Sequence, residues 1–329
     1  MSSFQAPPAS VPQHGVAADA AWRLLQAASA RAEQLEREGC LQAFAENGEE
    51  ELHQVPTDAD GSDAVLVWRP ERGWESKLPA DDPRSQLLNL YLPICSATSA
   101  RPLTVGHLGQ SLDGFIATPD GDSQFVTGGD NIVHVHRMRA LCDAVVVGAG
   151  TVAADDPQLT TRHVTGRSPL RVVFDPGRRL APTFRLFRDD EAPTLYICAR
   201  SHLSPGEERV GHALVAGIDN GGPGSEVAQV LRLLRARGCA RVFVEGGGVT
   251  VSAFLEANLL DRLQIAVAPV LIGEGRPAIR LAPRSRLRDC LRPGYRVFRM
   301  GGDVLFDCEL REGADTGESR PRGAVNRVI

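Results

Sequence analysis

Val242-Phe243-Val244-Glu245-Gly246-Gly247-Gly248-Val249-Thr250 decides the fold, because it reads as a buried strand that turns through three glycines into a helix. Backbone N–H groups at a helix N-terminus, which glycines let a ligand approach closely, form a site suited to a phosphate or pyrophosphate. A plain strand-to-helix turn explains the same residues. The run is neither a Gly-x-Gly-x-x-Gly fingerprint nor a Walker loop. Glu245 ends its strand, where α/β sheets place ligands, and a surface or helix-start carboxylate is the alternative.

Strands and helices alternate on both sides of this stretch. The helix expected at 225–237 is amphipathic, and a hairpin around Gly301-Gly302 ends the pattern. This order predicts an α/β domain at 102–310 with a mostly parallel sheet flanked by helices and a C-terminal antiparallel hairpin. We expect strands at 103–108, 144–147, 170–174, 194–198, 213–215, 241–244, 264–270, 296–300 and 304–310, and helices at 130–141, 225–237 and 249–257.

The first third of the chain has a different pattern of apolar and polar residues. Residues 17–48 read as one helix, 55–83 as short alternating runs suited to a small hairpin, and 85–91 as a second helix. We therefore expect residues 16–101 to form a small α+β extension of unknown role. Residues 1–15 and 311–329 are polar or rich in small residues, and we expect both to be disordered.

Composition excludes several classes of protein. A net charge of −5 and a pI of about 5.9 argue against nucleic acid as the main partner. No apolar run approaches the roughly 18 residues of a membrane span, and the N-terminus lacks the order of a secretory signal. The seven cysteines are scattered and never form Cys-x-x-Cys, which is typical of free thiols. We therefore expect a cytoplasmic protein with no membrane partner.

A second segment, residues 145–162, repeats the pattern of a buried strand that ends in glycines. Asp155-Asp156-Pro157 follows, and a turn alone explains these two acids. We predict no metal site, because no His or Cys lies nearby at ligand spacing. Arg162 carries a guanidinium that can pair with a phosphate in bidentate fashion.

A third segment, residues 108–127, contains Asp113-Gly114, a strong signal for a tight turn. Farther along, His134 and His136 suggest a metal pair. Residues two apart on a helix do not share a face, so we expect no metal there. A serine hydrolase is not expected either, because no Gly-x-Ser-x-Gly elbow occurs.

Taken in order, the three segments resemble the reductase domain of the bacterial bifunctional riboflavin-biosynthesis deaminase/reductase, in the dihydrofolate-reductase-like superfamily. The resemblance covers residues 102–310. It implies that fold, a homodimer, and NADPH-dependent reduction of the ribosyl group of 5-amino-6-(5-phosphoribosylamino)uracil to ribityl. It is carried by Ser111-Leu112-Asp113-Gly114, Gly150-Thr151-Val152 through Asp155-Asp156-Pro157-x-Leu159-Thr160-x-Arg162, Glu245-Gly246-Gly247, and Ala268-Pro269-x-Leu271-x-Gly273.

The family pattern implies a role for each matching position. Asp155 and Glu245 are the expected catalytic residues, for orientation and polarisation and for anchoring the pyrimidine. Arg178 and Arg179 are our hypothesis for the 2′-phosphate of NADPH. The implied substrate residues are Ser123, Arg139, Leu159, Arg162 and Glu245, with the arginines near the substrate phosphate. The implied cofactor residues are Gly109, Phe125, Thr151, Asp155, Arg178, Gly246, Gly247, Gly248, Val249 and Thr250.

Two departures from the family pattern leave alternatives open. The family commonly has Trp where Phe125 stands, and residues 1–101 lack the His-x-Glu and Pro-Cys-x-x-Cys of the zinc deaminase. We therefore expect no deamination and no zinc. Three roles for the extension stay open: it caps the reductase, it extends a dimer interface, or it modifies the active-site entrance. The alternatives are a paralogous reductase of a related pyrimidine, reduction of a pterin such as dihydrofolate, and a non-catalytic NADP-binding protein. Arg139 and Arg162 favour a phosphorylated substrate, and the presence of Asp155, Arg162 and Glu245 favours catalysis.

Overall fold

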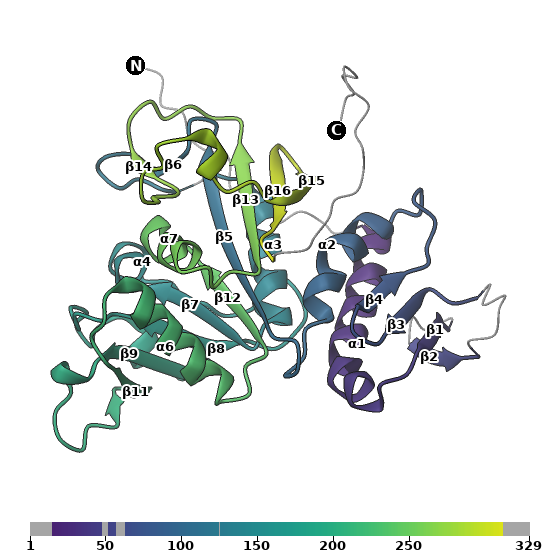
Figure 1. The fold of residues 1–329 in the computed structure, drawn as a ribbon, viewed down its shortest axis with the longest axis horizontal. Helices are drawn as coiled ribbons and strands as arrows, with labels where there is room; N and C mark the ends of the chain where they lie inside the picture. Colours follow the sequence, from purple (N-terminus) through teal and green to yellow (C-terminus); the bar gives the residue numbers. More distant parts are fainter. Residues whose placement is uncertain (1–14, 48–51, 57–62, 125, 312–329) are drawn as a thin grey trace.

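A ten-stranded sheet forms the centre of the computed structural model, which describes residues 15–47, 52–56, 63–124 and 126–311 (Figure 1). Seven consecutive strands of this sheet pair in parallel with one another; a short antiparallel strand follows at one edge, and the predicted antiparallel hairpin follows at the other. In sheet order the strands are β10 (Arg209–Val210), β11 (Ala213–Ile218), β9 (Thr194–Ala199), β8 (Leu170–Phe174), β7 (Ala144–Gly148), β12 (Arg241–Glu245), β5 (Leu103–Ser111), β13 (Arg262–Ala268), β16 (Asp303–Glu309) and β15 (Gly294–Met300). The predicted α/β fold is confirmed.

Alternate side chains of the parallel strands point into two hydrophobic cores, one on each face of the sheet. Phe243 belongs to one core and its neighbours Val242 and Val244 to the other, because successive strand side chains point to opposite faces. One face is covered by α3 (Gly129–Leu141), and the other by α6 (Pro223–Arg235) and α7 (Gly248–Glu256). Shorter elements complete the domain: α4 (Ala149–Asp155), α5 (Arg185–Arg188), η1 (Arg200–His202), η2 (Leu287–Asp289), β6 (Phe115–Ala117) and β14 (Arg276–Pro277).

The N-terminal extension (residues 16–101) is the predicted α+β unit, seen at the right of Figure 1. Its helices are α1 (Val16–Glu38) and α2 (Ser85–Cys95), and its antiparallel sheet has the order β2 (Leu52–Val55), β1 (Gln42–Glu46), β3 (Leu66–Arg69), β4 (Gly73–Ser76). The prediction of one helix over 17–48 was wrong. Gly39 adopts the left-handed conformation (φ 63°) and donates its N–H to Leu35 O, which ends α1 before β1 begins. The segments expected to be disordered lie outside the described residues, except Gly15 and Arg311.

The extension shares one hydrophobic core with the α3 face of the large sheet. Leu25 of α1, Tyr91 of α2 and Met138 of α3 are all fully buried in this cluster. A polar contact crosses the same boundary, since the Tyr91 hydroxyl lies 2.6 Å from His134 Nδ1. The extension is therefore built into the domain.

Arg241 on β12 is the main polar link between the sheet and the extension. Its side chain is buried, and its guanidinium donates to the carbonyl oxygens of Ser29, Cys95 and Ala97 at 3.0–3.3 Å. A buried guanidinium is tolerated where its N–H groups find acceptors in this way.

No helix among the described residues is both long and apolar enough to cross a membrane. All seven cysteines fall in the described part of the chain, where each is a free thiol; Cys40 and Cys290 are exposed and the other five are buried.

Replacing Arg241 by Met tests how firmly the extension is attached. The change keeps apolar bulk but leaves the buried carbonyl oxygens of Cys95 and Ala97, at the end of α2, without their side-chain donor, so the free energy of unfolding should fall by about 2–4 kcal/mol. Urea denaturation measures this. Arg200→Met, which removes a pair with Asp219 whose two side chains are 65% and 73% exposed, should shift the midpoint little. Equal effects of the two variants would contradict this role.

Candidate functional site

A cavity of about 630 Å³ opens at the carboxyl ends of the central parallel strands. Leu108 and Gly109 of β5, Phe174 of β8 and Gly246 after β12 contribute to its wall. Parallel α/β sheets bind ligands at this edge, and the cavity is large enough for a cofactor or substrate. Of the predicted site residues, those that line it are Gly109, Ser123, Thr151, Asp155, Gly246, Gly247, Gly248, Val249 and Thr250.

Gly247 and Gly248, at the start of α7, form a cradle in which neither position has room for a Cβ. Gly246 and Gly247 have φ values of 62° and 63°, which favour glycine. A Cβ at Gly247 would lie 2.6 Å from Thr151 Oγ1, and one at Gly248 would lie 2.3 Å from Ala278 O. The helix N-terminus therefore faces the cavity with bare backbone, which is the arrangement expected for an anion site.

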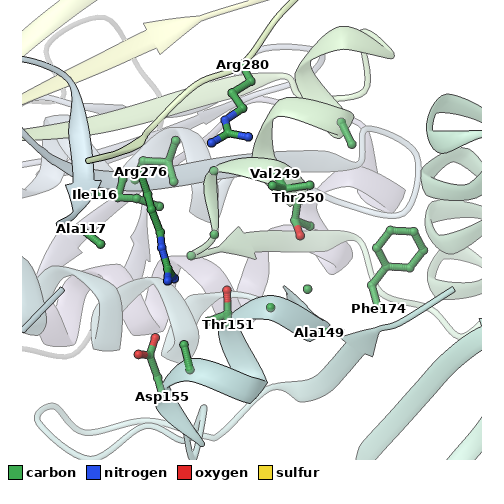
Figure 2. A pocket seen from close by; sticks show the side chains of 18 of the residues that line it. Ile116, Ala117, Ala149, Thr151, Asp155, Phe174, Val249, Thr250, Arg276 and Arg280 are labelled. Carbon is green, nitrogen blue, oxygen red and sulfur yellow. The ribbon is translucent and has the colours of Figure 1, made fainter. Parts of the chain in front are cut away.

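Helix α4 forms the opposite wall and presents Thr151 and Asp155. Partial removal from water raises the pKa of the Asp155 carboxyl, and the positive charge of Arg276 opposes that rise. Figure 2 shows Arg276 reaching across the cavity toward both residues, with Arg280 on the side of Val249 and Thr250. Neither arginine was predicted from the sequence, because the segment around them carries no periodic signal.

Arg276 and Arg280 come from a strap, residues 270–280, that closes one side of the cavity. Asp113 fastens the strap: its carboxylate accepts hydrogen bonds from Ile272 N at 3.1 Å and Gly273 N at 2.7 Å. The Ser111 hydroxyl at 2.5 Å and these amides lower the pKa of Asp113 to about 2. The tight turn at Asp113-Gly114 is therefore also a clamp.

The two arginines expected at the cofactor 2′-phosphate, Arg178 and Arg179, lie in different surroundings. Arg179 lines the cavity, with its guanidinium 3.5 Å from Asp175 Oδ1. Arg178 adopts a left-handed conformation (φ 48°) and pairs with Glu207, and it is not among the cavity residues. The geometry therefore favours Arg179 over Arg178 for contact with a ligand in the cavity.

A second group of predicted residues gathers beside the cavity on the α3 face. Arg139 of α3 forms a two-pronged ion pair with Glu245, with Nε 2.9 Å from Oε2, and also donates to Thr160 O at 3.1 Å. Arg162 lies on the adjoining loop, residues 158–168, and bonds the Thr160 hydroxyl at 2.7 Å. Leu159 is buried in that loop with φ 58°, a backbone conformation that is strained for leucine.

The two arginines of this group differ in whether a carboxylate neutralises their charge. Arg139 has a carboxylate partner, whereas Arg162 forms no ion pair with any other described residue. Desolvation and the nearby charge of Arg139 lower the pKa of Arg162, which nevertheless stays a cation at neutral pH. Arg162 is thus the arginine that retains free charge for an anion.

His107 on β5 is a further polar residue that the sequence analysis did not single out. It is the register partner of Glu245 and is 3% exposed. Neither ring nitrogen has a hydrogen-bond partner among the described residues, and the same holds for Asn131 Oδ1 on α3. Burial lowers the pKa of His107 to about 4, so the ring is neutral at pH 7. His107 therefore marks a polar position beside Glu245 on the neighbouring strand, with Asn131 near enough to act on its pKa.

His134 and His136 have structural partners. His134 lies between Tyr91 and Gln264 Oε1, 3.0 Å away, and His136 Nδ1 accepts the backbone N–H of Arg162 at 3.0 Å. Among the described residues no group of three or more His, Cys, Asp or Glu is arranged to hold a metal ion. Phe125, predicted at the cofactor, lies outside the described residues.

Comparison with known proteins identifies relatives of this domain. A family model described as the RibD C-terminal domain matches residues 104–291. The 2,5-diamino-6-ribosylamino-4(3H)-pyrimidinone 5′-phosphate reductase of Methanothermobacter thermautotrophicus is 35% identical over 223 residues, which cover 64% of this chain and 99% of that protein. The riboflavin biosynthesis protein RibD of Aquifex aeolicus is 31% identical over 64% of this chain, which spans only 58% of that longer protein.

Solved structures give the same result for the fold. A diaminohydroxyphosphoribosylaminopyrimidine deaminase/5-amino-6-(5-phosphoribosylamino)uracil reductase from Thermotoga maritima superposes with a TM-score of 0.53 at 28% identity, covering 67% of this chain and 58% of that one. The riboflavin biosynthesis reductase Rib7 of Saccharomyces cerevisiae also gives 0.53, at 20% identity, over 68% of this chain and 97% of its own.

Asp113→Asn tests the clamp on the strap. The depressed pKa means that the carboxylate stabilises the folded state fully above its ordinary pKa of 3.8, and this stabilisation is lost as pH falls toward 2. The melting temperature of the variant should therefore lie below that of the wild type above pH 5, and the difference should shrink toward pH 3. Asp120→Asn, in the separate exposed turn that follows β6, is the control. A difference independent of pH would exclude the clamp.

Proposed function

This chain belongs to the RibD C-terminal domain family, and from that membership we propose that it is an NADPH-dependent reductase of riboflavin biosynthesis. It reduces the ribosyl group of 5-amino-6-(5-phosphoribosylamino)uracil to ribityl. The single observation that carries the proposal is the pairing of a glycine cradle at α7 with the Arg139–Glu245–Arg162 group beside it. One half of the site suits a dinucleotide, and the other half suits a phosphorylated base.

The residues around the cavity fit a nicotinamide dinucleotide. Gly247 and Gly248 leave backbone amides open to a pyrophosphate, and Arg276 and Arg280 add positive charge from the strap. Thr151 and Asp155 on α4 would meet the nicotinamide end, and Arg179 the 2′-phosphate that distinguishes NADPH from NADH. When bound, the cofactor supplies a hydride.

The Arg139–Glu245 group would hold the substrate. Glu245 is fixed by Arg139 and can accept hydrogen bonds from pyrimidine N–H groups, beside the polar position of His107. Arg162 would bind the phosphate, since it keeps a free guanidinium, while Ser123 and Leu159 complete the pocket. Arg139 then acts by holding Glu245, in place of the direct phosphate contact that the family pattern implied.

The reaction requires little acid–base catalysis from the protein. In the ring-opened substrate, C1′ is doubly bonded to the nitrogen on the pyrimidine; a hydride adds to C1′ and a proton to that nitrogen, which gives the ribitylamino chain. The raised pKa of Asp155 keeps a proton available to a neighbouring group over a wider pH range than an ordinary carboxyl would. Its proposed role is to orient and polarise the reacting group.

Substrate specificity is tested by NADPH oxidation with purified full-length protein. We expect turnover of 5-amino-6-(5-phosphoribosylamino)uracil, and a loss of about tenfold or more in kcat/KM for Glu245→Gln, because a substrate N–H loses its charged acceptor. Glu208→Gln, an exposed change elsewhere, is the control. Preference for the undeaminated 2,5-diamino compound would make that compound the substrate in place of the deaminated one. Turnover of dihydrofolate alone would indicate a pterin reductase. Tight NADPH binding without any turnover would favour the paralogue or a non-catalytic protein.

Cofactor preference separates the two neighbouring arginines. Arg179→Ala should weaken NADPH binding about tenfold, the equivalent of about 1.4 kcal/mol, and leave NADH binding unchanged, because only the 2′-phosphate contact is lost. Titration by fluorescence or calorimetry measures both dissociation constants. Arg178→Ala, which breaks the pair with Glu207, is the matched control and should keep the NADPH preference. The reverse result would place the 2′-phosphate at Arg178.

The proposal extends to setting and assembly. We place the enzyme in the cytoplasm, which suits seven free thiols, and expect a homodimer as in the family. Light scattering of the purified protein measures its oligomeric state.

A further inference from the structure

The loop 158–168, which carries Arg162, is held from two sides. On the α3 side, His136 Nδ1 accepts the N–H of Arg162 at 3.0 Å, and the His136 and His163 rings meet edge to face with centroids 4.4 Å apart. Burial lowers the pKa of His136 to about 3, so this nitrogen remains an acceptor at neutral pH. Arg139, Arg162 and His163 are the charged or titratable groups around it.

The other support comes from the extension. Trp22 Nε1 of α1 donates to Thr165 O at 3.0 Å and lies 3.2 Å from the Thr165 hydroxyl. Gln26, one helical turn later, donates to the same carbonyl at 3.0 Å. Next to it, Gly166 has φ 139° and packs so closely that a Cβ there would lie 2.8 Å from Ala140 Cβ and 3.2 Å from Gln26 Nε2. The loop therefore lies against both helices.

Trp22 is itself firmly fixed. Its side chain is 4% exposed, Arg137 of α3 lies over its ring at 5.7 Å, and Tyr91 of α2 meets it edge to face at 6.1 Å. Cation–π and aromatic contacts of this kind hold a ring in one orientation. The indole N–H is consequently a rigid donor and not a surface group that happens to reach Thr165.

We infer that α1 of the extension is a positioning element for the substrate site: Trp22 and Gln26 hold Thr165 so that Arg162, three residues earlier, stays in place for the substrate phosphate. This assignment rests on the proposed function, because it takes Arg162 as a phosphate ligand. The family match begins at residue 104, after the extension. The contact is thus a feature that the extension adds to the reductase domain.

The test uses the double variant Trp22→Phe/Gln26→Leu in the full chain. It keeps the ring and aliphatic packing but removes both donors to Thr165 O. We expect KM for the phosphorylated aminopyrimidine to rise roughly fivefold or more, the equivalent of one net hydrogen bond, while kcat and the NADPH dissociation constant stay within about twofold. Amide exchange of residues 163–168 should accelerate. Gln26→Leu alone, which leaves Trp22 intact, should show a smaller change in the same direction.

Trp74→Phe is the matched control. It removes an equally buried indole donor from the same extension, but that indole bonds Ala28 O at 3.1 Å and not the loop. It should lower stability without changing KM or the exchange of residues 163–168. Equal effects of the two variants, or no effect of the double variant on an active enzyme, would overturn the inference. A wild-type protein that turns over no aminopyrimidine would contradict the proposed function instead, and the exchange data would still decide whether α1 holds the loop.

Discussion

The close approach of the Thr151 side chain and of the strap backbone to the glycines at the start of α7 is the constraint on which the cofactor half of the site depends. Thr151 of α4 lies on one side of Gly247, and the carbonyl oxygens of Pro277 and Ala278 lie on the other side of Gly248, so neither position has room for a Cβ. Closely packed walls of this kind cannot shift independently of one another. Because the strap is part of this contact, the Asp113 clamp fixes the positions of Arg276 and Arg280 as well as the turn in which it lies.

Helix α3 links the other half of the site to the N-terminal extension. One side of it carries Arg139 toward Glu245, and another places His134 against Tyr91 of α2. The extension therefore cannot be regarded as an appendage, since it completes the core that α3 needs and contacts the Arg162 loop directly through Trp22. Of the three roles considered from the sequence, a cap on the reductase agrees best with this packing.

The sequence predicted the parts of the fold that are encoded by contiguous residues. The run Val242 to Thr250 contains its own strand, turn and helix start, and the strand and helix lie within one residue of the predicted bounds. The end of α1 at Gly39 was not predicted, because a single glycine within a helical periodicity carries a weak signal and its left-handed conformation is visible only in the structure. The separation of Arg178 from Arg179 depends on a left-handed residue within a turn, and Arg276 reaches the cavity only because distant Asp113 fastens the strap. Neither outcome is visible in local sequence, because each depends on tertiary contacts.

Arg139 and Arg162, to which the family pattern gave the same role, differ in the charge that each has available for a phosphate. A buried guanidinium paired with a carboxylate is already neutralised, so Arg139 has little to gain from a phosphate. The guanidinium of Arg162 has only a hydroxyl partner among the described residues, and it lies in a loop whose leucine is strained. A cation in such a loop binds an anion well only if the surrounding structure holds it in position, since ordering it on binding would cost affinity. The contacts from α1 provide that order before the substrate arrives, which gives the extension a physical reason to be part of this reductase.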